Sequence, residues 1–365
     1  MGSGTIPLPL LAWYEREKRD LPWRKDRDPY HVWISEVMLQ QTRVEVVVPR
    51  YGAFLERFPD IRALARAPEN AVLAAWSGLG YYRRARDLHA AARAVVERHG
   101  GELPRTRDEL RELPGFGEYT AGAVLSIAFN LPEPILDGNV ARVLTRLDRI
   151  DGDPRRGPLA RQLRERVREL IPEGRASAFN QALMEMGALV CIPGRPRCSE
   201  CPLKSRCLAF RAGDAARFPA LAPRRRSVGV DLTAAVVSLG GRYLLERRSD
   251  GGPSYLRGLW GFPLANGKPR DGVRALRIRI RKAAGIRSKP QEPLGVIRHS
   301  ITFRKIALHA VRFETEGKSL ASHKRHGDAF AWHEIERLGR DLPASSLALK
   351  VRALVDGSRP GGGGR

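Results

Sequence analysis

Four cysteines stand close together in a chain that has no others, at Cys191, Cys198, Cys201 and Cys207. Their spacing is C-x6-C-x2-C-x5-C, so all four fall within seventeen residues. Four thiolates in one loop can supply the four corners of a cubane iron–sulfur cluster. Zinc is the main alternative, but structural zinc sites usually repeat a Cys-x-x-Cys knuckle that occurs only once here. Disulfides are disfavoured in a reducing compartment. The spacing therefore predicts a metal centre, most simply a [4Fe–4S] cluster.

Cations interrupt this cysteine loop: Arg195 and Arg197 between its first two cysteines, and Lys204 and Arg206 between its last two. The plainer interpretation is a solvated surface loop. The whole chain, however, has 64 Lys and Arg against 40 Asp and Glu, a net charge of +24. A protein this basic is expected to have a polyanionic partner, although a GC-rich genome that favours arginine codons accounts for part of the excess. We expect Arg195 and Arg197 to meet nucleic-acid phosphates.

Two carboxyl groups occur in settings that could give them different protonation states. Glu36 is expected on a helix, and its neighbours three and four residues away are Val32, Trp33, Leu39 and Gln40. Such a mostly apolar surround raises the pKa of a carboxyl, which can then act as a general acid near neutral pH. The alternative for Glu36 is an ordinary surface position. Asp137 precedes a helix expected from about residue 139, and taken alone it is best explained as the N-cap.

A glycine-containing turn, residues 113–122, separates two helical stretches. Gly115 and Gly117 permit a tight turn and a close backbone approach. The N–H groups at the start of the next helix can then bind a phosphate. The pattern matches the helix-hairpin-helix element of DNA-binding proteins.

The hairpin, the aspartate that follows it and the four-cysteine spacing together resemble the endonuclease III superfamily of DNA glycosylases. Within that superfamily, residues 33–42, WISEVMLQQT, resemble the catalytic helix of the MutY family of adenine glycosylases. The resemblance is close over residues 8–210 and looser beyond residue 228. It implies a monofunctional adenine DNA glycosylase of base excision repair. Such an enzyme flips adenine mispaired with 8-oxoguanine or guanine out of the duplex and hydrolyses its glycosidic bond.

The resemblance also implies catalytic roles. Glu36 would protonate adenine N7, and Asp137 would support the cationic sugar. Asn139 and Tyr119 would help Glu36 to place the attacking water. Bifunctional members of the superfamily have lysine at the position of Tyr119, where its amine forms a Schiff base, so we expect no strong lyase activity.

Other residues are implied to contact the substrate. Gln41 and Tyr81 resemble the residues that fill the gap left by the flipped base, although core packing is an alternative for Tyr81. Gln181 resembles an adenine-edge contact, with a plain helix-surface position as the alternative. The remaining DNA contacts that we expect are Arg24, Gly115, Gly117, Arg195 and Arg197.

Residues 228–356 resemble the C-terminal domain of the family, which is related to Nudix hydrolases. An active Nudix helix needs several glutamates to hold a divalent cation. The corresponding positions here are Arg279, Lys282 and Ala283. Since these residues cannot hold a metal, we expect no pyrophosphatase activity and a recognition role instead.

The family reads 8-oxoguanine with a Phe-Ser-His loop, and the matching stretch here, residues 298–304, lacks that histidine. His299, Ser300 and Thr302 are the implied substitutes. The alternative is that this stretch is merely a strand.

The elements that must position these residues follow from periodicity and from Gly and Pro punctuation. Beyond the helix that Asp28-Pro29 opens, helices are predicted near residues 60–75, 82–98, 106–112, 118–129, 139–148, 158–170 and 176–190. After residue 228, strands are predicted at 230–239 and 243–246 as a hairpin, a helix at 272–284, and strands over 292–313.

Four segments follow from this pattern. We expect a helical catalytic domain at residues 1–210, an interdomain linker at 211–227, a Nudix-like α+β recognition domain at 228–356 and a disordered tail at 357–365. No run of eighteen apolar residues and no secretory signal are recognised, so we expect a cytoplasmic protein that acts on the nucleoid. We expect a monomer, because a duplex that is bound by the two domains of one chain needs no second copy.

Two other functions remain possible from the residues. One is an endonuclease III-like or thymine-mismatch glycosylase, which Tyr119 and the Glu36 helix disfavour. The other is a catalytically silent DNA-binding protein, which the intact pair of Glu36 and Asp137 disfavours. A transcription factor is a weaker possibility still.

Overall fold

The computed structural model describes residues 6–155, 157–221, 226–248, 256–316 and 330–357. The chain divides into two compact units, residues 1–66 with 90–223, and residues 67–89 with 224–365. Within the described ranges, no helix has the length and apolar character needed to cross a bilayer.

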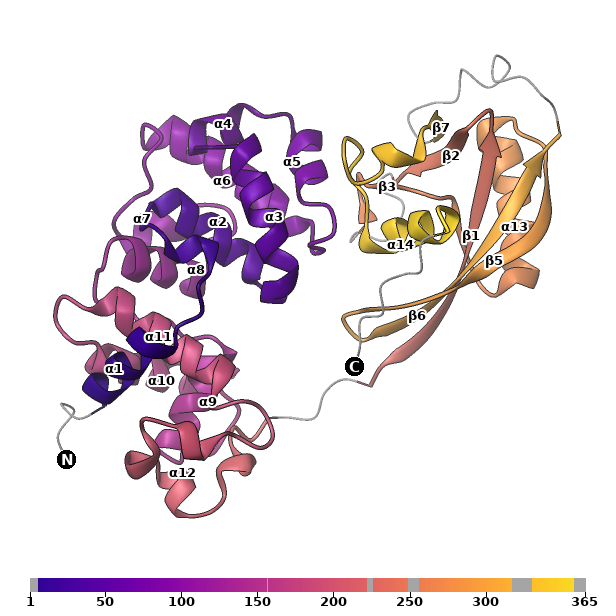
Figure 1. Ribbon diagram of the computed structural model, residues 1–365. Helices are drawn as coiled ribbons and strands as arrows, with labels where there is room; N and C mark the ends of the chain where they lie inside the picture. Colours follow the sequence, from indigo (N-terminus) through magenta and orange to yellow (C-terminus); the bar gives the residue numbers. More distant parts are fainter. Residues whose placement is uncertain (1–5, 156, 222–225, 249–255, 317–329, 358–365) are drawn as a thin grey trace. The chain divides into compact units, whose positions relative to one another are not determined.

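All regular structure described before residue 222 is helical (Figure 1). The helices are α1 (Pro7–Glu17), α2 (Pro29–Leu39), α3 (Val44–Arg57), α4 (Ile61–Arg66), α5 (Glu69–Ala75), α6 (Arg83–Arg98), α7 (Arg107–Arg111), α8 (Glu118–Ala123), α9 (Gly138–Leu147), α10 (Gly157–Leu170), α11 (Ala176–Leu189) and α12 (Leu208–Arg211). Short helical turns also occur at Pro22–Arg24, Val124–Ala128, Cys198–Glu200, Lys204–Arg206 and Ala215–Arg217.

Local sequence explains where several helices begin. The Asp28 carboxylate accepts a hydrogen bond from the Tyr30 N–H at 2.7 Å, and Pro29 occupies the first helical position of α2. Thr106 caps α7 in the same way. Asp137 caps α9 by accepting from the Val140 N–H at 2.7 Å, so its predicted N-cap position is confirmed.

Two predicted helices differ from the structure in detail. The segment 60–75 is interrupted at Ala67-Pro68, because a residue before proline disfavours the helical conformation. The segment 118–129 begins as α8 and changes to a π-helical turn at Val124–Ala128.

Part of the segment predicted as a linker is packed. Phe218 is only 2% exposed, and its carbonyl accepts a hydrogen bond from Arg146 Nε at 3.0 Å. Residues 222–225, and residues 358–365 of the predicted tail, lie outside the described residues.

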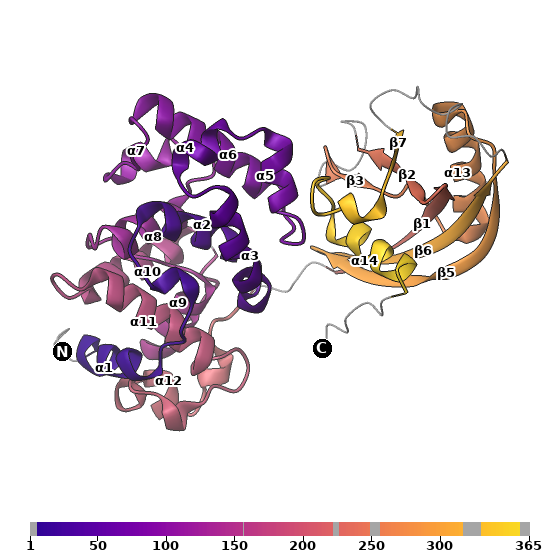
Figure 2. The ribbon, with the colours of Figure 1, turned by 45° about the horizontal axis from the view of Figure 1, so that its top comes forward.

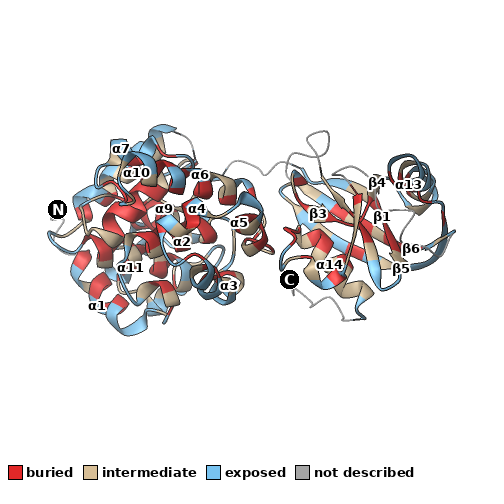
Figure 3. Cartoon of the chain, turned by 90° about the horizontal axis from the view of Figure 1, so that it is seen from above, coloured by how far each residue is buried: buried red, intermediate tan, exposed pale blue. Residues whose placement is uncertain are grey.

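Buried residues lie in the interior of each unit, as the colouring of Figure 3 shows. A large core of the first unit joins α1, α9, α10 and α11, and includes Leu10, Leu144, Leu163, Phe179 and Leu183. A smaller core places α2 against α8 and the π-helical turn through Val32, Ala123, Ile127 and Ile135. These two cores hold α2, α8, α9 and α11 in fixed positions.

The part after residue 226 is α+β, as predicted. Its strands are β1 (Val228–Leu239), β2 (Arg242–Arg247), β3 (Trp260–Gly261), β4 (Leu264–Asn266), β5 (Ser288–Ile301), β6 (Arg304–Thr315) and β7 (Phe330–His333), and its helices are α13 (Pro269–Ala284) and α14 (Ser346–Val355). The strand order is β3-β2-β1-β6-β5, with β4 beside β1 and β7 beside β2. Strands β1 and β6 are parallel, and the other named pairs are antiparallel.

Successive side chains of β1 point to opposite faces of the sheet, and each face is covered by a hydrophobic core. Ala235 and Val237 pack with α13, whereas Ala234 and Val236 belong to the core that contains α14 residues. The two helices lie on opposite faces (Figure 2). The predicted β1–β2 hairpin is confirmed by the pairing of Leu239 with Arg242.

Candidate active site

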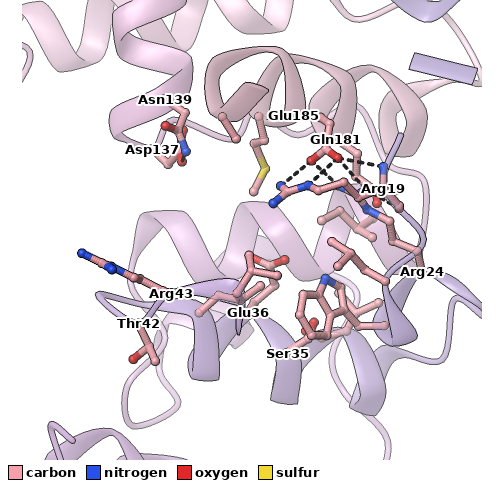
Figure 4. Close-up of a pocket in the computed structure, with 18 of the residues that line it drawn as sticks. Arg19, Arg24, Ser35, Glu36, Thr42, Arg43, Asp137, Asn139, Gln181 and Glu185 are labelled. Atoms are coloured by element: carbon pink, nitrogen blue, oxygen red, sulfur yellow. Dashed lines mark hydrogen bonds and ion pairs between the residues drawn. The ribbon is translucent and has the colours of Figure 1, made fainter. Parts of the chain in front are cut away.

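A cavity of about 260 Å³ opens between α2, α8, α9 and α11 in the first unit (Figure 4). Six of the residues predicted from the sequence line it: Arg24, Glu36, Tyr119, Asp137, Asn139 and Gln181. In Figure 4, Asp137 and Asn139 lie on the opposite side of the cavity from Glu36. The fold thus brings together carboxyl groups that are about a hundred residues apart in the chain.

Glu36 lies on the cavity side of α2 and is 4% exposed. Burial raises the pKa of its carboxyl to about 7, and the charge of Asp137 acts in the same direction. A hydrogen bond from Tyr119 opposes the rise without cancelling it. The carboxyl is therefore protonated in a large fraction of molecules at neutral pH.

Tyr119 reaches Glu36 from α8, just after the glycine hairpin. Its hydroxyl donates to Glu36 Oε2 at 2.5 Å. Burial holds the pKa of Tyr119 well above its ordinary value, so the hydroxyl keeps its proton. Gly115 adopts φ +76°, a left-handed conformation that favours glycine, and Gly117 is the N-cap of α8.

Asp137 is held by two hydrogen bonds at the start of α9. Besides the bond from the Val140 N–H, it accepts one from Asn139 Nδ2 at 2.8 Å. Burial raises the pKa of Asp137, while these hydrogen bonds and the nearby Arg142 act against the rise. The two hydrogen bonds fix the direction of the carboxylate and stabilise its charged form, but burial is the larger effect and the pKa stays above its ordinary value.

Arg142 links this helix start to the cysteine loop. Its guanidinium donates to Asn139 Oδ1 at 2.9 Å, to the Gly187 carbonyl at 2.7 Å and to the Cys191 carbonyl at 2.7 Å. A chain of hydrogen bonds therefore runs from Asp137 through Asn139 and Arg142 to the first cysteine.

Arg19, Arg24 and Glu185 line a further side of the cavity, and the sequence did not predict their ion pairs. Glu185 on α11 is 1% exposed and accepts from Arg19 Nη2 at 2.8 Å and from Arg24 Nη2 at 2.9 Å (Figure 4). Burial alone would raise its pKa, but the two arginines lower it to about 2. The only signal in the sequence is that Glu185 is the single charged residue of α11. Arg24, expected at the DNA, is thus bound to Glu185, and its DNA contact stays a prediction.

Gln181 also lines the cavity. Its amide oxygen accepts from the Tyr14 hydroxyl at 3.2 Å, and its amide nitrogen donates to Ser177. Gln41 and Tyr81 adopt φ +56° and φ +46°, uncommon for residues with a Cβ, and both are exposed. Outlying backbone at exposed polar and aromatic side chains is often associated with function.

The four cysteines surround a second, small cavity of about 30 Å³. Arg146 and Lys204 also line it, and Arg146 Nη1 lies 3.4 Å from Cys191 Sγ. Arg146 itself is 2% exposed. Among the described residues, no group of three or more His, Cys, Asp or Glu side chains has the geometry for a single metal ion. Four thiol donors around one space, with cations beside them, suit an anionic iron–sulfur cluster.

The residues expected to read 8-oxoguanine gather at the tip of the β5–β6 hairpin. His299 and Ser300 lie on β5, paired with Ile306 and Lys305, and Thr302 occupies the turn with φ +53°. Ser300 and Thr302 are exposed, and His299 Nδ1 lies 3.5 Å from Lys350 Nζ.

Comparison with known proteins agrees with this geometry. Residues 34–169 match the family model described as HhH-GPD superfamily base excision DNA repair protein. Human adenine DNA glycosylase is 36% identical over 409 aligned positions, covering 96% of this chain and 74% of that protein. The structure of a thermostable thymine-DNA glycosylase is similar over 57% of this chain and 97% of that chain, with 28% identity and a TM-score of 0.53.

The helical fold, the hairpin and the paired carboxyls of the cavity define a base excision repair enzyme, a DNA N-glycosylase. Within that class, the similarity to the human protein extends over almost the whole chain. The chain belongs to the adenine DNA glycosylase family.

Proposed function

We propose that this enzyme hydrolyses the N-glycosidic bond of adenine mispaired with 8-oxoguanine or guanine, after the base has been flipped into the cavity. The observation that carries the proposal is the buried carboxyl of Glu36, with a pKa raised to about 7, in one cavity with Asp137. Two carboxyls held in different environments can divide the roles of acid and charge stabiliser.

Glu36 acts as the general acid. Its proton goes to adenine N7, which makes the neutral base a better leaving group as the bond to the sugar breaks. Tyr119 holds the Glu36 carboxyl through Oε2, and no other hydrogen bond to Glu36 occurs in the described part of the chain. The Glu36 carboxyl can therefore direct its other oxygen at the base.

Asp137 stabilises the positive charge that develops on the sugar. Its hydrogen bonds to Asn139 and to the start of α9 keep the carboxylate in position without a large rearrangement. After proton transfer, the Glu36 carboxylate accepts a proton from the attacking water. Because Tyr119 is no amine, no Schiff base forms, and the reaction ends at hydrolysis.

Recognition of the flipped adenine is assigned to Gln181, whose amide can pair with an adenine edge. The Tyr14 hydroxyl orients that amide by donating to its oxygen. Gln41 and Tyr81 fill the gap that the base leaves in the duplex. We expect the enzyme to act on the duplex as a monomer.

Cys191, Cys198, Cys201 and Cys207 hold the [4Fe–4S] cluster, which organises their loop and takes no part in bond breaking. The exposed Arg195 and Arg197 in that loop then contact the DNA backbone.

The test is base release from matched duplexes under single-turnover conditions. We expect release of adenine from A:8-oxoG and A:G duplexes, and no release of thymine from T:G. Thymine release, or no release from any of the three, would show that the assignment is wrong. Glu36→Gln is expected to abolish most of the adenine release while leaving duplex affinity close to that of the parent.

A separate experiment tests whether the β5–β6 hairpin recognises 8-oxoguanine. The Ser300→Ala/Thr302→Ala double variant should lose much of the preference for A:8-oxoG over A:G, and His299→Ala should weaken it further. An unchanged preference in all variants would reject this hairpin as the reader.

A further inference from the structure

A recess with a strongly basic lining lies in the second unit, and none of its lining residues takes part in the proposed reaction. Its volume is about 480 Å³. Its polar lining consists of Arg274, Arg277, Arg281, Arg287, Ser288 and Glu316. These residues come from α13, from the start of β5 and from the position after β6.

The helix presents its arginines as one stripe. Arg274, Arg277 and Arg281 are spaced by three and four residues, which places them along the same face of α13. Leu276 and Ile280 are fully buried in the core that this helix shares with the sheet. The stripe therefore lies beside the sheet-facing side of α13, where it borders Arg287 and Ser288.

Few anionic groups offset these four charges. Among the described residues, Arg274, Arg281 and Arg287 form no ion pair with a carboxylate, and Arg277 Nε donates to the Ser288 carbonyl at 3.3 Å. Glu316 is the one carboxylate in the lining, and its nearest cation is Lys289 Nζ at 3.7 Å. Like charges gathered around one recess repel one another, and an anion bound there would relieve the repulsion.

Ser288 provides a second and independent observation. The residue is 6% exposed, and its buried hydroxyl has no hydrogen-bond partner in the described part of the chain. Buried hydroxyls are normally paired, and an unpaired one in a native structure calls for an explanation. Because Ser288 lines the recess, rotation of its short side chain would turn this hydroxyl toward a ligand oxygen there, which would supply the missing partner.

We propose that this recess binds a phosphate group. Guanidinium groups match phosphate oxygens with paired hydrogen bonds, and a serine hydroxyl adds a further donor. The lining has no cluster of carboxylates that could hold a divalent cation, so phosphate is bound directly and is not hydrolysed. The phosphate could belong to a DNA strand or to a free diphosphate, and the site goes beyond the base-excision reaction in either case.

The first arm of the test uses inorganic pyrophosphate and the full chain, by isothermal titration calorimetry. The recess variant is Arg274→Gln/Arg281→Gln. The matched control is Arg270→Gln/Lys282→Gln, which removes the same charge from exposed positions of α13 outside the recess. We expect the recess variant to bind pyrophosphate at least about tenfold more weakly than the control.

The second arm measures the affinity for an undamaged duplex as a function of salt concentration. If a DNA phosphate is the ligand, the log–log slope should fall by about 0.9 per lost contact in the recess variant and less in the control. A loss specific to the recess in either arm supports the site and identifies the source of the phosphate. The proposal is overturned if the recess variant loses no more than the control in both arms.

Ser288→Ala isolates the hydroxyl without a change of charge. We expect pyrophosphate or duplex binding, whichever arm responds, to weaken about threefold, with an unchanged or higher thermal unfolding midpoint. Adenine release measured in parallel keeps this site separate from the proposed function, since failure here leaves that reaction untouched.

Discussion

If Glu36 is the general acid, as proposed, the rate of base excision depends on pH. Since its pKa is raised to about 7, the acid form is lost as pH rises through 7. We expect the single-turnover rate of adenine release to fall above about pH 7 in the parent. Glu36→Gln should lower the rate by a factor of about 10² to 10⁴ at pH 6.5, the usual contribution of a general acid. A variant with near-normal release would remove Glu36 from the mechanism.

The variant Tyr119→Phe tests what sets the pH above which the rate falls. Its hydrogen bond lowers the pKa of Glu36, so Tyr119→Phe should move the alkaline limb of the rate profile to higher pH. The measurement is single-turnover release between pH 5.5 and 9. A limb that stays in place or moves downward would contradict the hydrogen bond as its cause.

The buried carboxyl also makes stability depend on pH. A folded-state pKa raised from 4.5 to about 7 favours the protonated form, so its contribution to stability is full below about 4.5 and is lost as pH rises through 7. Between pH 4.5 and 8 this amounts to about 3 kcal/mol. The Glu36→Gln side chain cannot ionise, so the variant should not lose this stability as pH rises. Between pH 4.5 and 8, its free energy of unfolding should therefore increase by about 3 kcal/mol relative to that of the parent, as measured by urea unfolding at both pH values.

At the scale of elements, the close contact between α9 and α11 positions Asp137, the proposed charge stabiliser. A Cβ added at Gly187 on α11 would lie 2.6 Å from Asn139 Cβ and 3.0 Å from the Asn139 carbonyl oxygen. Gly187→Ala must therefore push the first turn of α9, with Asn139 and Asp137, away from its place. We expect a loss of about 1–3 kcal/mol of stability and at least a tenfold slower release of adenine.

Gly52→Ala is the matched control, because this exposed glycine of α3 has no atom within 4 Å of the added Cβ. It should stabilise the protein by up to about 1 kcal/mol and leave the rate unchanged. If both variants behave alike in the rate assay, close contact between α9 and α11 does not position Asp137.

Helix starts were predictable where capping residues or prolines mark them in the local sequence. Asp28-Pro29 and Asp137 mark helix starts in the sequence itself, and the structure confirms both. The break at Ala67-Pro68 was missed although the proline was visible, because the apolar spacing continues across it.

The candidate site was predictable for side chains that belong to a recognisable motif, such as Glu36 and Tyr119. The ion pairs of Glu185 with Arg19 and Arg24 join residues more than 160 positions apart, and helical periodicity carries no information on such pairs. The recess on α13 could not be predicted for a different reason, since a basic helix ordinarily indicates only a solvated face.

At the scale of the whole molecule, the cysteine loop is expected to serve folding and DNA binding rather than chemistry. Cys198→Ser should lower the iron content, the thermal midpoint and the affinity for an undamaged duplex. The rate at saturating DNA, scaled to the folded fraction, should stay within about threefold of the parent. Iron analysis, calorimetry and single-turnover release measure the three quantities. Normal folding and affinity with a slow chemical step would contradict this division.

We expect the burial of Arg146 beside the cysteines to make folding of the chain depend on the supply of iron in the cell. This guanidinium is 2% exposed, and its partners are backbone carbonyls and the Cys191 sulfur rather than any carboxylate in the described residues. Cysteine ligands of a bound cluster are thiolates, whose charge balances such a cation, whereas neutral thiols leave it uncompensated. In cells starved of iron, newly made chains would fold less completely and be removed by proteases. We expect the amount of this repair enzyme, and with it the rate of spontaneous mutation, to follow nutritional iron even at constant transcription.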